Sequence, residues 1–508
     1  MGIAFHFPLI IIFLPMLGAL AMPLVRSGSV ARAITLAIQA TLICLSLWLA
    51  TALWNAPIAY FTYQMGYFPA PWGNELRAGM LEALLATAFA TVMLFSILGT
   101  KYDLERDIDG NKQYLYYCMV GLLSTSLMAL VFTNDLFTAY VFIEVSTIAA
   151  CAIVVAKETG ETLKATIKYL FLSVMGSGLF LLATAILLSI TGHLLMEPTH
   201  EVITALMASG EYRFPLTMTI LLFIVSMAVK SALFPFHTWL PDAHASATTS
   251  SSAILSGLVL KGYVVLLLKL LYRVYGLETI AALNVFPVLF VLGITGIIAG
   301  SLMACFQTKL KRLIAYSSVG QIGYIFMGMG LATQGGFTIA SYHIIAHSVT
   351  KSMLFIAAGA LINAAGGSYL ISDLTGAGRK NKIAGIAFTV GALSMAGIPL
   401  FAGFVSKFYL AGAAVHGGHN IWVTLPVLAI SAFLSGVYFF PVLFKIYSRE
   451  TSEASPTKDT TPALAITPET GGFSRNVTLI CLMAANVALG MLFVPLLEML
   501  ETGFLWLG

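Results

Sequence analysis

The sequence predicts an all-α membrane protein that crosses the bilayer about fourteen times. Of its 508 residues, 59% are hydrophobic and only 9% are charged, which is too little charge to coat a water-soluble surface. Apolar runs of about 20 residues, the length that spans a bilayer, recur along nearly the whole chain. Basic residues gather at alternate ends of these runs, as they do in membrane proteins of fixed orientation.

Each predicted span is an apolar run bounded by polar, glycine-rich or proline-rich residues. The first run is expected to be a retained helix and not a signal peptide, because no basic residue precedes it and Arg26 follows it. The long polar stretch from Ser448 to Arg475 is expected to be a surface loop. The runs lie near residues 7–25, 31–54, 79–98, 114–131, 133–155, 163–191, 214–235, 246–272, 280–302, 307–330, 337–364, 384–411, 421–446 and 474–500.

The lysines and arginines favour one orientation, because short cytoplasmic loops carry an excess of basic residues. With the N-terminus outside, four basic residues fall outside: Arg77, Arg213, Lys269 and Arg273. Eighteen fall in inside loops or adjoining run ends: Arg26, Arg32, Lys101, Arg106, Lys112, Lys157, Lys164, Lys168, Lys309, Lys311, Arg312, Arg379, Lys380, Lys382, Lys445, Arg449, Lys458 and Arg475. Both termini are therefore expected outside, with the chain in the cell (plasma) membrane.

Four basic residues are left unassigned by this count and fall inside apolar runs: Lys230, Lys261, Lys351 and Lys407. Glu144 lies near the centre of the run 133–155. A charged side chain at mid-bilayer costs about 2.5–3.5 kcal/mol on insertion scales, so several of them together predict a function. Lys261 lies too far from either end of its run for its stem to reach the interface, whereas Lys230 lies nearer an end, where that alternative stays open. Asp135 and Glu82 lie at the starts of their runs and could be merely interfacial residues.

Proline interrupts two runs close to a lysine. Pro235 and Pro241 follow Lys230, and Pro399 precedes Lys407. Broken backbone at membrane depth is tolerated only against protein or a water-filled cavity, so these helices are expected to be broken and to face such a region.

Interrupted segments in corresponding places of two halves indicate a transporter built from repeats. Runs four to eight and nine to thirteen would be such halves, and because five is an odd number the two copies would have inverted topology. The predicted domains are 1–113 for the first three runs, 114–272 and 273–446 for the two repeats, and 447–508 for a polar cytoplasmic loop and the last run. No convincing residue identity links the halves.

His343, His347 and Lys351 are four residues apart and therefore share one face of the run 337–364. An unperturbed imidazole titrates at about pH 6.5, so this face is predicted to relay protons. The alternative is that the histidines only hydrogen-bond between helices. A metal site is not expected, because no carboxylate or cysteine accompanies the histidines and Lys351 would repel a cation. The predicted path starts at a Glu144–Lys230 pair and continues through Lys261, His347, His343, Lys351 and Lys407.

Other classes of function find little support in the sequence. The formal charge of +4 is dispersed, with no basic tail for nucleic acid. The five cysteines lack the CxxC spacing or neighbouring histidines of a metal or redox centre. The sequence has no Walker loop and no GxGxxG placed after a strand. We therefore expect no cofactor and no catalytic chemistry in the chain itself, even if it serves a redox-driven translocase.

Six segments carry a family resemblance: FTNDLFTAYVFIEVSTIAA, KSALFPFHTWLPDAHASA, SSAILSGLVLKGY, KRLIAYSSVGQIGYIFMG, SYHIIAHSVTKSMLF and GIPLFAGFVSKF. They resemble the antiporter-like subunits shared by complex I, membrane-bound hydrogenases and Mrp-type cation/proton antiporters. The resemblance covers about residues 80 to 445. It implies fourteen helices, two inverted five-helix repeats, broken seventh and twelfth helices, and proton translocation within a multisubunit complex. It implies family roles for Glu144, Lys230, Lys261, His343, His347 and Lys407.

The stretches YFPAPWGNELRAG and IKYLFLSVMGSGLFLLATAILLSITGHLLM look most like the D-type subunit of Mrp antiporters and its relatives in energy-converting hydrogenases. Lys407 argues against the complex I branch that carries glutamate at that position. The preferred hypothesis is a proton-conducting subunit of an Mrp-type sodium/proton antiporter, or of an Mrp-like module in a redox-driven pump. Its partners would be other membrane subunits, protons and the lipid bilayer, and passage of sodium through this chain is left open.

Two alternatives remain. One is an integral subunit of a proton-pumping NADH:quinone oxidoreductase or hydrogenase, in which electrons from peripheral subunits drive the same path. The other is a solitary carrier for an organic solute, which predicts a roomy midplane pocket with polar selectivity groups.

The predicted orientation can be tested by cysteine labelling in a variant whose five native cysteines are replaced. Met65→Cys is expected to react with an impermeant maleimide added outside intact cells, whereas Lys458→Cys should react only once the cells are opened. Labelling of residue 458 from outside would refute either the count of fourteen spans or their orientation.

Overall fold

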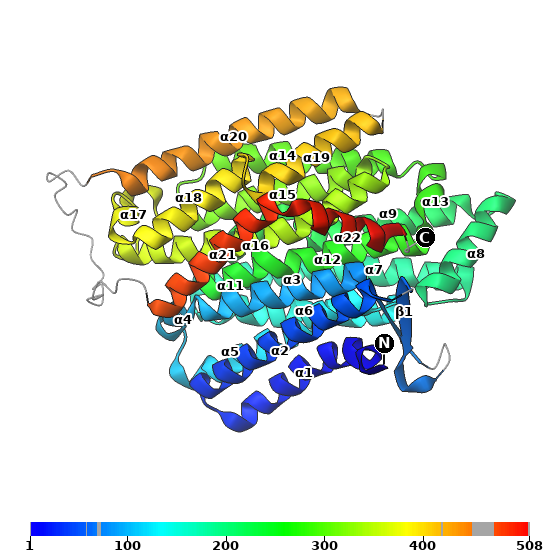
Figure 1. The fold of residues 1–508 in the computed structure, drawn as a ribbon, viewed down its shortest axis with the longest axis horizontal. Coiled ribbons are helices and arrows are strands. Elements are labelled where there is room, and N and C mark those ends of the chain that lie inside the picture. Colours follow the sequence, from blue (N-terminus) through cyan, green and yellow to red (C-terminus); the bar gives the residue numbers. More distant parts are fainter. Residues whose placement is uncertain (1, 57, 69–72, 418–419, 450–471, 506–508) are drawn as a thin grey trace.

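The protein is a bundle of long helices that lie side by side (Figure 1). The computed structural model describes residues 2–56, 58–68, 73–417, 420–449 and 472–505. Within these residues, twelve helical segments are long and apolar enough to cross a membrane, which confirms the predicted polytopic all-α fold. Most of the predicted loop 448–475, including Lys458, lies outside the described residues.

The elements follow the order of the predicted runs. The first region contains η1 (Gly2–His6), α1 (Phe7–Val25), α2 (Gly28–Trp54), β1 (Tyr60–Gln64), η2 (Met65–Tyr67), β2 (Glu75–Gly79), α3 (Met80–Leu98), α4 (Lys101–Asp107) and η3 (Gly110–Lys112). Next come α5 (Gln113–Phe132), α6 (Leu136–Val155), α7 (Gly160–Thr191), α8 (Met196–Ser209), α9 (Arg213–Lys230), η4 (Phe236–Trp239), α10 (Leu240–Ser246), α11 (Thr249–Ile254), η5 (Leu255–Val259), α12 (Leu260–Lys269) and η6 (Leu270–Tyr275). The last are α13 (Leu277–Ala282), α14 (Phe286–Cys305), α15 (Leu310–Gly330), α16 (Gln334–Ala364), η7 (Ile371–Asp373), α17 (Ala377–Lys380), α18 (Lys382–Ala396), α19 (Ala402–His416), α20 (Ile421–Tyr447), α21 (Phe473–Met491) and α22 (Phe493–Leu505).

Two predicted spans lie outside the twelve apolar segments. One is α15, which is 21 residues long and carries Lys311 and Arg312 in its first turn. The other, predicted for 384–411, consists of the shorter apolar helices α18 and α19. Twelve segments plus these two account for the fourteen predicted runs in the described part of the chain. The last run is divided at Leu492 into α21 and α22.

The first predicted break separates α9 from α10. α9 ends at Lys230, and Pro235 immediately precedes η4. Pro241 lies in the first turn of α10, where a missing N–H loses no helical hydrogen bond. Trp239 Nε1 donates to the carbonyl oxygen of Val229 at 3.2 Å, so the last turn before the break gains a side-chain partner.

The second predicted break separates α18 from α19. Gly397 follows α18 with φ at +85°, a left-handed conformation that glycine adopts without steric cost. Pro399 lies between the two helices. A Cβ atom at Gly403 would overlap the carbonyl oxygen of Ser394, so the close approach of α19 to α18 also requires glycine.

The helical segment that carries Lys261 contains two wide turns that the sequence did not predict. η5 and η6 are both π-helical, and Lys261 lies just beyond η5. Such turns inside α-helices often mark functional sites. A Cβ atom at Gly257 would overlap Ser352 Oγ, so glycine lets η5 approach α16 closely.

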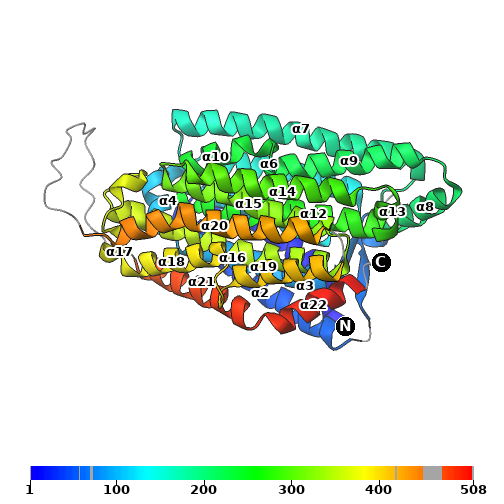
Figure 2. The same ribbon diagram turned by 90° about the horizontal axis from the view of Figure 1, so that it is seen from above.

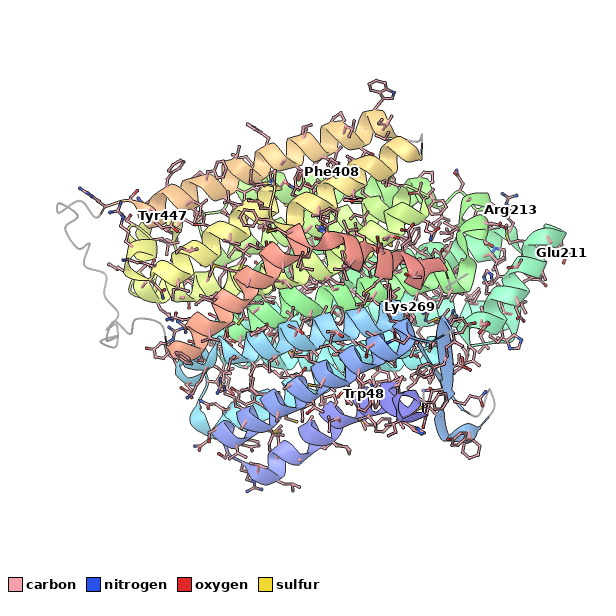
Figure 3. All side chains as sticks on the ribbon, in the orientation of Figure 1. Trp48, Glu211, Arg213, Lys269, Phe408 and Tyr447 are labelled. Atoms are coloured by element: carbon pink, nitrogen blue, oxygen red, sulfur yellow. The ribbon has the colours of Figure 1, made fainter. Side chains whose placement is uncertain are left out.

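The bundle has two distinct ends (Figures 1 and 2). The hairpin end holds the antiparallel strands β1 and β2, α8 and both described chain ends, whereas the α4 end holds α4 and α17. In Figure 3, Glu211 and Arg213 lie at the hairpin end and Tyr447 lies at the α4 end. An even number of crossings returns the chain to the side on which it started, and the position of both described chain ends at one end of the bundle agrees with this.

An ion pair is buried at the hairpin end. Arg273 of η6 donates to the carboxylate of Glu82, and their side chains are only 1% and 3% exposed. Glu82 also accepts a hydrogen bond from the backbone N–H of Gly79 at 2.9 Å and so caps α3. Glu82 is thus a buried, paired residue, and its partner lies 191 positions away in the sequence.

Most of the basic residues assigned to the outside are buried. Lys269 donates to three carbonyl oxygens at the end of α5, that of Val131 at 2.8 Å, where a cation favours the negative end of the helix dipole. Arg77 and Arg273 are also buried, whereas Arg213 is exposed. The hairpin end, which is predicted to lie outside, therefore exposes even less positive charge among the described residues than the sequence count suggested.

A polar network joins α4, α16 and α21 at the α4 end. The fully buried carboxylate of Asp103 lies 3.1 Å from Arg475 Nη2 and accepts a hydrogen bond from Asn363 Nδ2 at 2.7 Å. Arg106 Nη1 donates to Asn363 Oδ1 at 2.5 Å. This network fixes the start of α21 against the helices that precede it.

Removal of Glu82 tests whether its ion pair stabilises the hairpin end. Glu82→Ala leaves Arg273 buried without its carboxylate, so the free energy of unfolding should fall by about 3–5 kcal/mol. Thermal unfolding of the purified protein measures this, with Glu211→Ala, an exposed residue at the same end, as the control. Equal unfolding temperatures for both variants would contradict a stabilising pair.

Candidate functional site

Lys230, the last residue of α9, is fully buried. Its Nζ donates to Thr147 Oγ1 of α6 at 2.6 Å and lies 5.6 Å from the centroid of the Tyr263 ring of α12. The Tyr263 hydroxyl forms a hydrogen bond of 2.7 Å with Ser146 Oγ. Lys230 therefore does not reach the interface, and neutral groups hold its ammonium.

Glu144 lies one helical turn before Thr147 on α6 and is partly exposed. It is near enough to Lys230 to interact electrostatically, but the two side chains form no ion pair within 4 Å in the structure as described. The Glu144–Lys230 pair is thus a through-space interaction in this conformation, with Thr147 as the direct partner of the lysine.

Lys261 is fully buried at the start of α12, close to the wide turn η5. Its Nζ donates to the carbonyl oxygen of Ser256, inside that turn. Ser256 Oγ forms a hydrogen bond of 2.9 Å with Ser318 Oγ of α15. The turn thus supplies both a direct partner for Lys261 and a hydroxyl link to the neighbouring helix.

Lys351 is fully buried on α16 and points to α15. Its Nζ donates to the Ile314 carbonyl oxygen at 2.8 Å and to Ser317 Oγ at 2.5 Å. Ser318 Oγ donates to the same carbonyl oxygen at 3.1 Å. A short string of hydrogen-bonding groups on α15 therefore extends from Lys351 toward the partners of Lys261.

His343 and His347 lie on the same face of α16, as predicted, and are 3% and 2% exposed. Their ring centroids are 5.6 Å apart and the ring planes differ by 16°. None of the four ring nitrogens has a hydrogen-bond partner among the described residues. The backbone of Gln321 on α15 lies close to the His343 ring, but no hydrogen bond of normal geometry joins either imidazole to another helix in this part of the chain.

Lys407 of α19 contacts the other half of its broken helix. Its Nζ donates to the carbonyl oxygens of Met395 at 2.8 Å and Ala396 at 3.0 Å, the last two residues of α18. It also lies 5.5 Å from the ring centroid of Tyr324, and that ring is 5.6 Å from the ring of His343. The Tyr324 ring thus lies next to both His343 and Lys407.

This geometry changes the predicted order of the path. Lys351 does not lie between His343 and Lys407, because it is two turns of α16 away from His343 and its ammonium contacts α15. Along α16 the order is Lys351, His347 and His343, followed through the Tyr324 ring by Lys407.

Sequence reasoning missed His244. It lies on α10, just beyond the first break, is fully buried, and stacks on Phe355 of α16 with ring centroids 4.6 Å apart. It has no hydrogen-bond partner among the described residues, and it interacts electrostatically with Lys351, Lys311 and Lys261. The sequence does contain a signal for it, because His244 lies in the segment LPDAHASA, directly after the predicted break. Only the prolines of this region were interpreted from the sequence.

Lys311 was also missed, because the sequence places it at the inside end of the run 307–330, among the basic residues expected at the interface. Its side chain is buried, its Nζ donates to the Ala247 carbonyl oxygen at 3.0 Å, and it lies 5.7 Å from the ring centroid of Tyr369. The Tyr369 hydroxyl accepts a hydrogen bond from Lys157 Nζ at 3.2 Å. Lys311 therefore connects the α4 end of the bundle with the region of His244.

The described residues contain no group of three or more His, Cys, Asp or Glu side chains that could hold a metal ion. The assembled residues instead alternate ammonium groups, imidazoles and hydroxyls through α9, α12, α15, α16 and α19. Such groups can accept and release protons without any covalent rearrangement.

Comparison with known proteins identifies the family. Residues 133–435 match the family described as NADH:quinone oxidoreductase/Mrp antiporter, TM. The chain belongs to this family. It is 32% identical over 450 residues to the N subunit of the NADH-quinone oxidoreductase of Desulforudis audaxviator, which covers 87% of this chain and 86% of that one. It is 30% identical over 354 residues to the D subunit of the Na(+)/H(+) antiporter of Alkalihalophilus pseudofirmus, which covers 69% of each chain.

Two solved structures share the fold of this family member. A chain of the Mrp complex from Dietzia sp. DQ12-45-1b superposes with a TM-score of 0.86 at 21% identity, covering 99% of this chain and 97% of that one. A chain of the archaeal membrane-bound sulfane sulfur reductase superposes with a TM-score of 0.85 at 24% identity, covering 98% and 97%. Relatives and structural neighbours alike are subunits of membrane complexes.

Proposed function

We propose that this chain is a proton-translocating, antiporter-like subunit of a multisubunit cation/proton antiporter or of an Mrp-like module in a redox-driven pump. The observation that carries the proposal is the buried row of titratable residues across the bundle. Its members are the buried Lys230, Lys261, Lys351, His347 and His343 and the partly buried Lys407, with Glu144 beside Lys230 and His244 beside Lys351 and Lys261. A row of isolated titratable groups suits a bare proton better than an organic solute.

Neutral partners make these lysines suitable for transfer. Lys261, Lys351 and Lys407 donate to carbonyl oxygens, and none of them forms an ion pair among the described residues. A carboxylate partner would be left buried and unpaired whenever the lysine lost its proton, at a cost of about 3–5 kcal/mol. Carbonyl partners avoid that cost, so both protonation states of each lysine are accessible.

The two helix breaks support an ion path for a second reason. Interrupted helices at membrane depth occur where protein or a cavity covers the free backbone groups, and in transporters they surround the transported ion. Lys230 precedes the first break, whereas Lys407 follows the second. We keep the division into two inverted repeats, 114–272 and 273–446, as part of the proposal, and this difference in lysine position fits the lack of residue identity between the halves.

We also propose the orientation. The α4 end would face the cytoplasm and the hairpin end, with both termini, would face outside across the plasma membrane. The burial of Arg77, Lys269 and Arg273 supports this, because it removes three of the four basic residues that stood against it. Glu144, partly exposed on α6, would face a neighbouring membrane subunit.

A second candidate function is an integral proton-pumping subunit of an NADH:quinone oxidoreductase or a membrane hydrogenase. The 32% identity to an oxidoreductase subunit, which extends over 87% of this chain, favours it. Both candidates use the same buried row, and they differ in the partner that drives it. Purification of the native complex and identification of its subunits distinguishes them, because only the second requires iron–sulfur or hydrogenase-like subunits.

Removal of a single titratable site tests the proposed path. Lys261→Ala and Glu144→Ala are each expected to reduce proton transport by about a hundredfold, the lower end of what one positioned proton-transfer group contributes. Transport in membrane vesicles measures this, with the exposed Lys382→Ala as the control. Normal transport at normal membrane abundance in either variant would remove that residue from the path.

The two histidines need a variant that separates relay from hydrogen bonding. His347→Gln keeps a donor and an acceptor but does not titrate near neutral pH. It should assemble with its partners and unfold at the native temperature, yet lose most proton transport. If transport survives, the imidazoles are structural, and the proton crosses between Lys261 and Lys407 by way of hydroxyl groups or water.

A further inference from the structure

A cavity of about 470 Å³ opens at the α4 end, beside the start of α7. Lysines from three separate segments line it: Lys157 after α6, Lys164 on α7 and Lys309 before α15. Tyr369 forms part of its wall, and Glu161 is the acidic residue of its lining. The cavity therefore has a net positive lining at one end of the membrane-spanning bundle.

Two of these lysines are uncommitted. Lys164 and Lys309 are exposed, and neither forms an ion pair with another described residue. Lys157 lies 3.6 Å from Asp107 and donates to the Tyr369 hydroxyl, so it has partners and remains 23% exposed. An anionic group in the cavity would give Lys164 and Lys309 the counter-charge that the described residues do not provide.

An apolar groove of about 510 Å³ adjoins the cavity along α7. Ile167, Phe171 and Leu172 line it, and Ile167 and Phe171 are 59% and 68% exposed. Lys164 lines both the cavity and the groove, so the two meet at this residue. A positive cavity that continues into an apolar groove is complementary to a molecule with an anionic head and a hydrocarbon tail.

The depth of the site fits a lipid. α7 has 32 residues and is therefore about 48 Å long, whereas the hydrocarbon core of a bilayer is about 30 Å thick. Because its first turns carry the charged residues Glu161, Lys164 and Lys168, these turns belong in the headgroup region, and the groove extends from there toward the hydrocarbon. Basic pockets between transmembrane helices bind anionic lipid headgroups in this position.

We propose that an anionic phospholipid binds here, with its phosphate between Lys157, Lys164 and Lys309 and one acyl chain along Ile167 and Phe171. The site also touches α10 through Ser246. The lipid would therefore contact the segment that carries His244 and the Tyr369 ring that covers Lys311. A lipid bound in this way would bridge α10, the second half of the first broken helix, and the start of α7 on the membrane-facing surface.

Native mass spectrometry of the delipidated native complex, titrated with phosphatidylglycerol or phosphatidylcholine, tests the proposal. The Lys164→Gln/Lys309→Gln variant should bind one phosphatidylglycerol more weakly, by about fivefold for each lysine removed. The matched control, Lys101→Gln/Lys382→Gln, removes two exposed lysines outside the cavity and should bind phosphatidylglycerol like the native complex. Phosphatidylcholine binding should be equal in all three proteins.

A groove variant distinguishes a lipid from a soluble anion. Ile167→Ser/Phe171→Ser should weaken phosphatidylglycerol binding, and inorganic phosphate at the same concentration should not displace the lipid. Unchanged phosphatidylglycerol affinity in the lysine variant overturns the proposal. Displacement by phosphate, together with full affinity in the groove variant, overturns it in favour of a soluble-anion site. These readouts do not depend on transport, so they stand apart from the proposed function.

Discussion

Inside a bilayer, every backbone carbonyl group and every charge must find its partner within the protein, and this constraint links the broken helices to the buried lysines. A break frees carbonyl oxygens, and a buried ammonium needs acceptors. Lys407 meets both needs at the end of α18, and Lys269 does so at the end of α5. Lys261 and Lys351 likewise donate to carbonyl oxygens of η5 and α15. At Lys407, Lys261 and Lys269, the buried ammonium and the irregular or terminal backbone are therefore parts of the same arrangement, whereas Lys351 donates to a carbonyl oxygen within the continuous helix α15.

The kind of partner separates buried charges that support the fold from those suited to transfer. Arg273 and Glu82 form an ion pair, and loss of either charge would leave the other buried alone. The guanidinium also does not deprotonate in proteins, so this pair is fixed. Lys230, in contrast, is held by the hydroxyl of Thr147, with Glu144 farther away. The hairpin end is thus held by permanent charges, whereas the interior of the bundle holds charges that can be neutralised.

The sequence predicted the spans, both breaks and the shared face of His343 and His347, because each depends on residues close together in the chain. A proline in an apolar run, or two histidines four residues apart, has the same meaning in most tertiary contexts. The missed features depend on distant contacts. In the sequence, Lys311 resembles an interfacial residue beside Arg312, and its burial follows from the position of Ala247, 64 residues earlier. The order of residues in the proposed path depends on the packing of α16 against α15, which no local pattern encodes.

The contact between Lys407 and the end of α18 has a mechanical consequence. A protonated lysine presents three N–H donors and a full charge to the negative end of that helix, whereas a neutral amine presents two donors and no charge. The contact between Lys407 and the end of α18 is therefore stronger when Lys407 is protonated. The distance between α18 and α19 is consequently linked to the protonation state of Lys407. Such linkage is reciprocal. A neighbouring subunit that pulled α18 and α19 apart would thereby lower the proton affinity of Lys407. Protonation of Lys407 would, in turn, draw the two half-helices together.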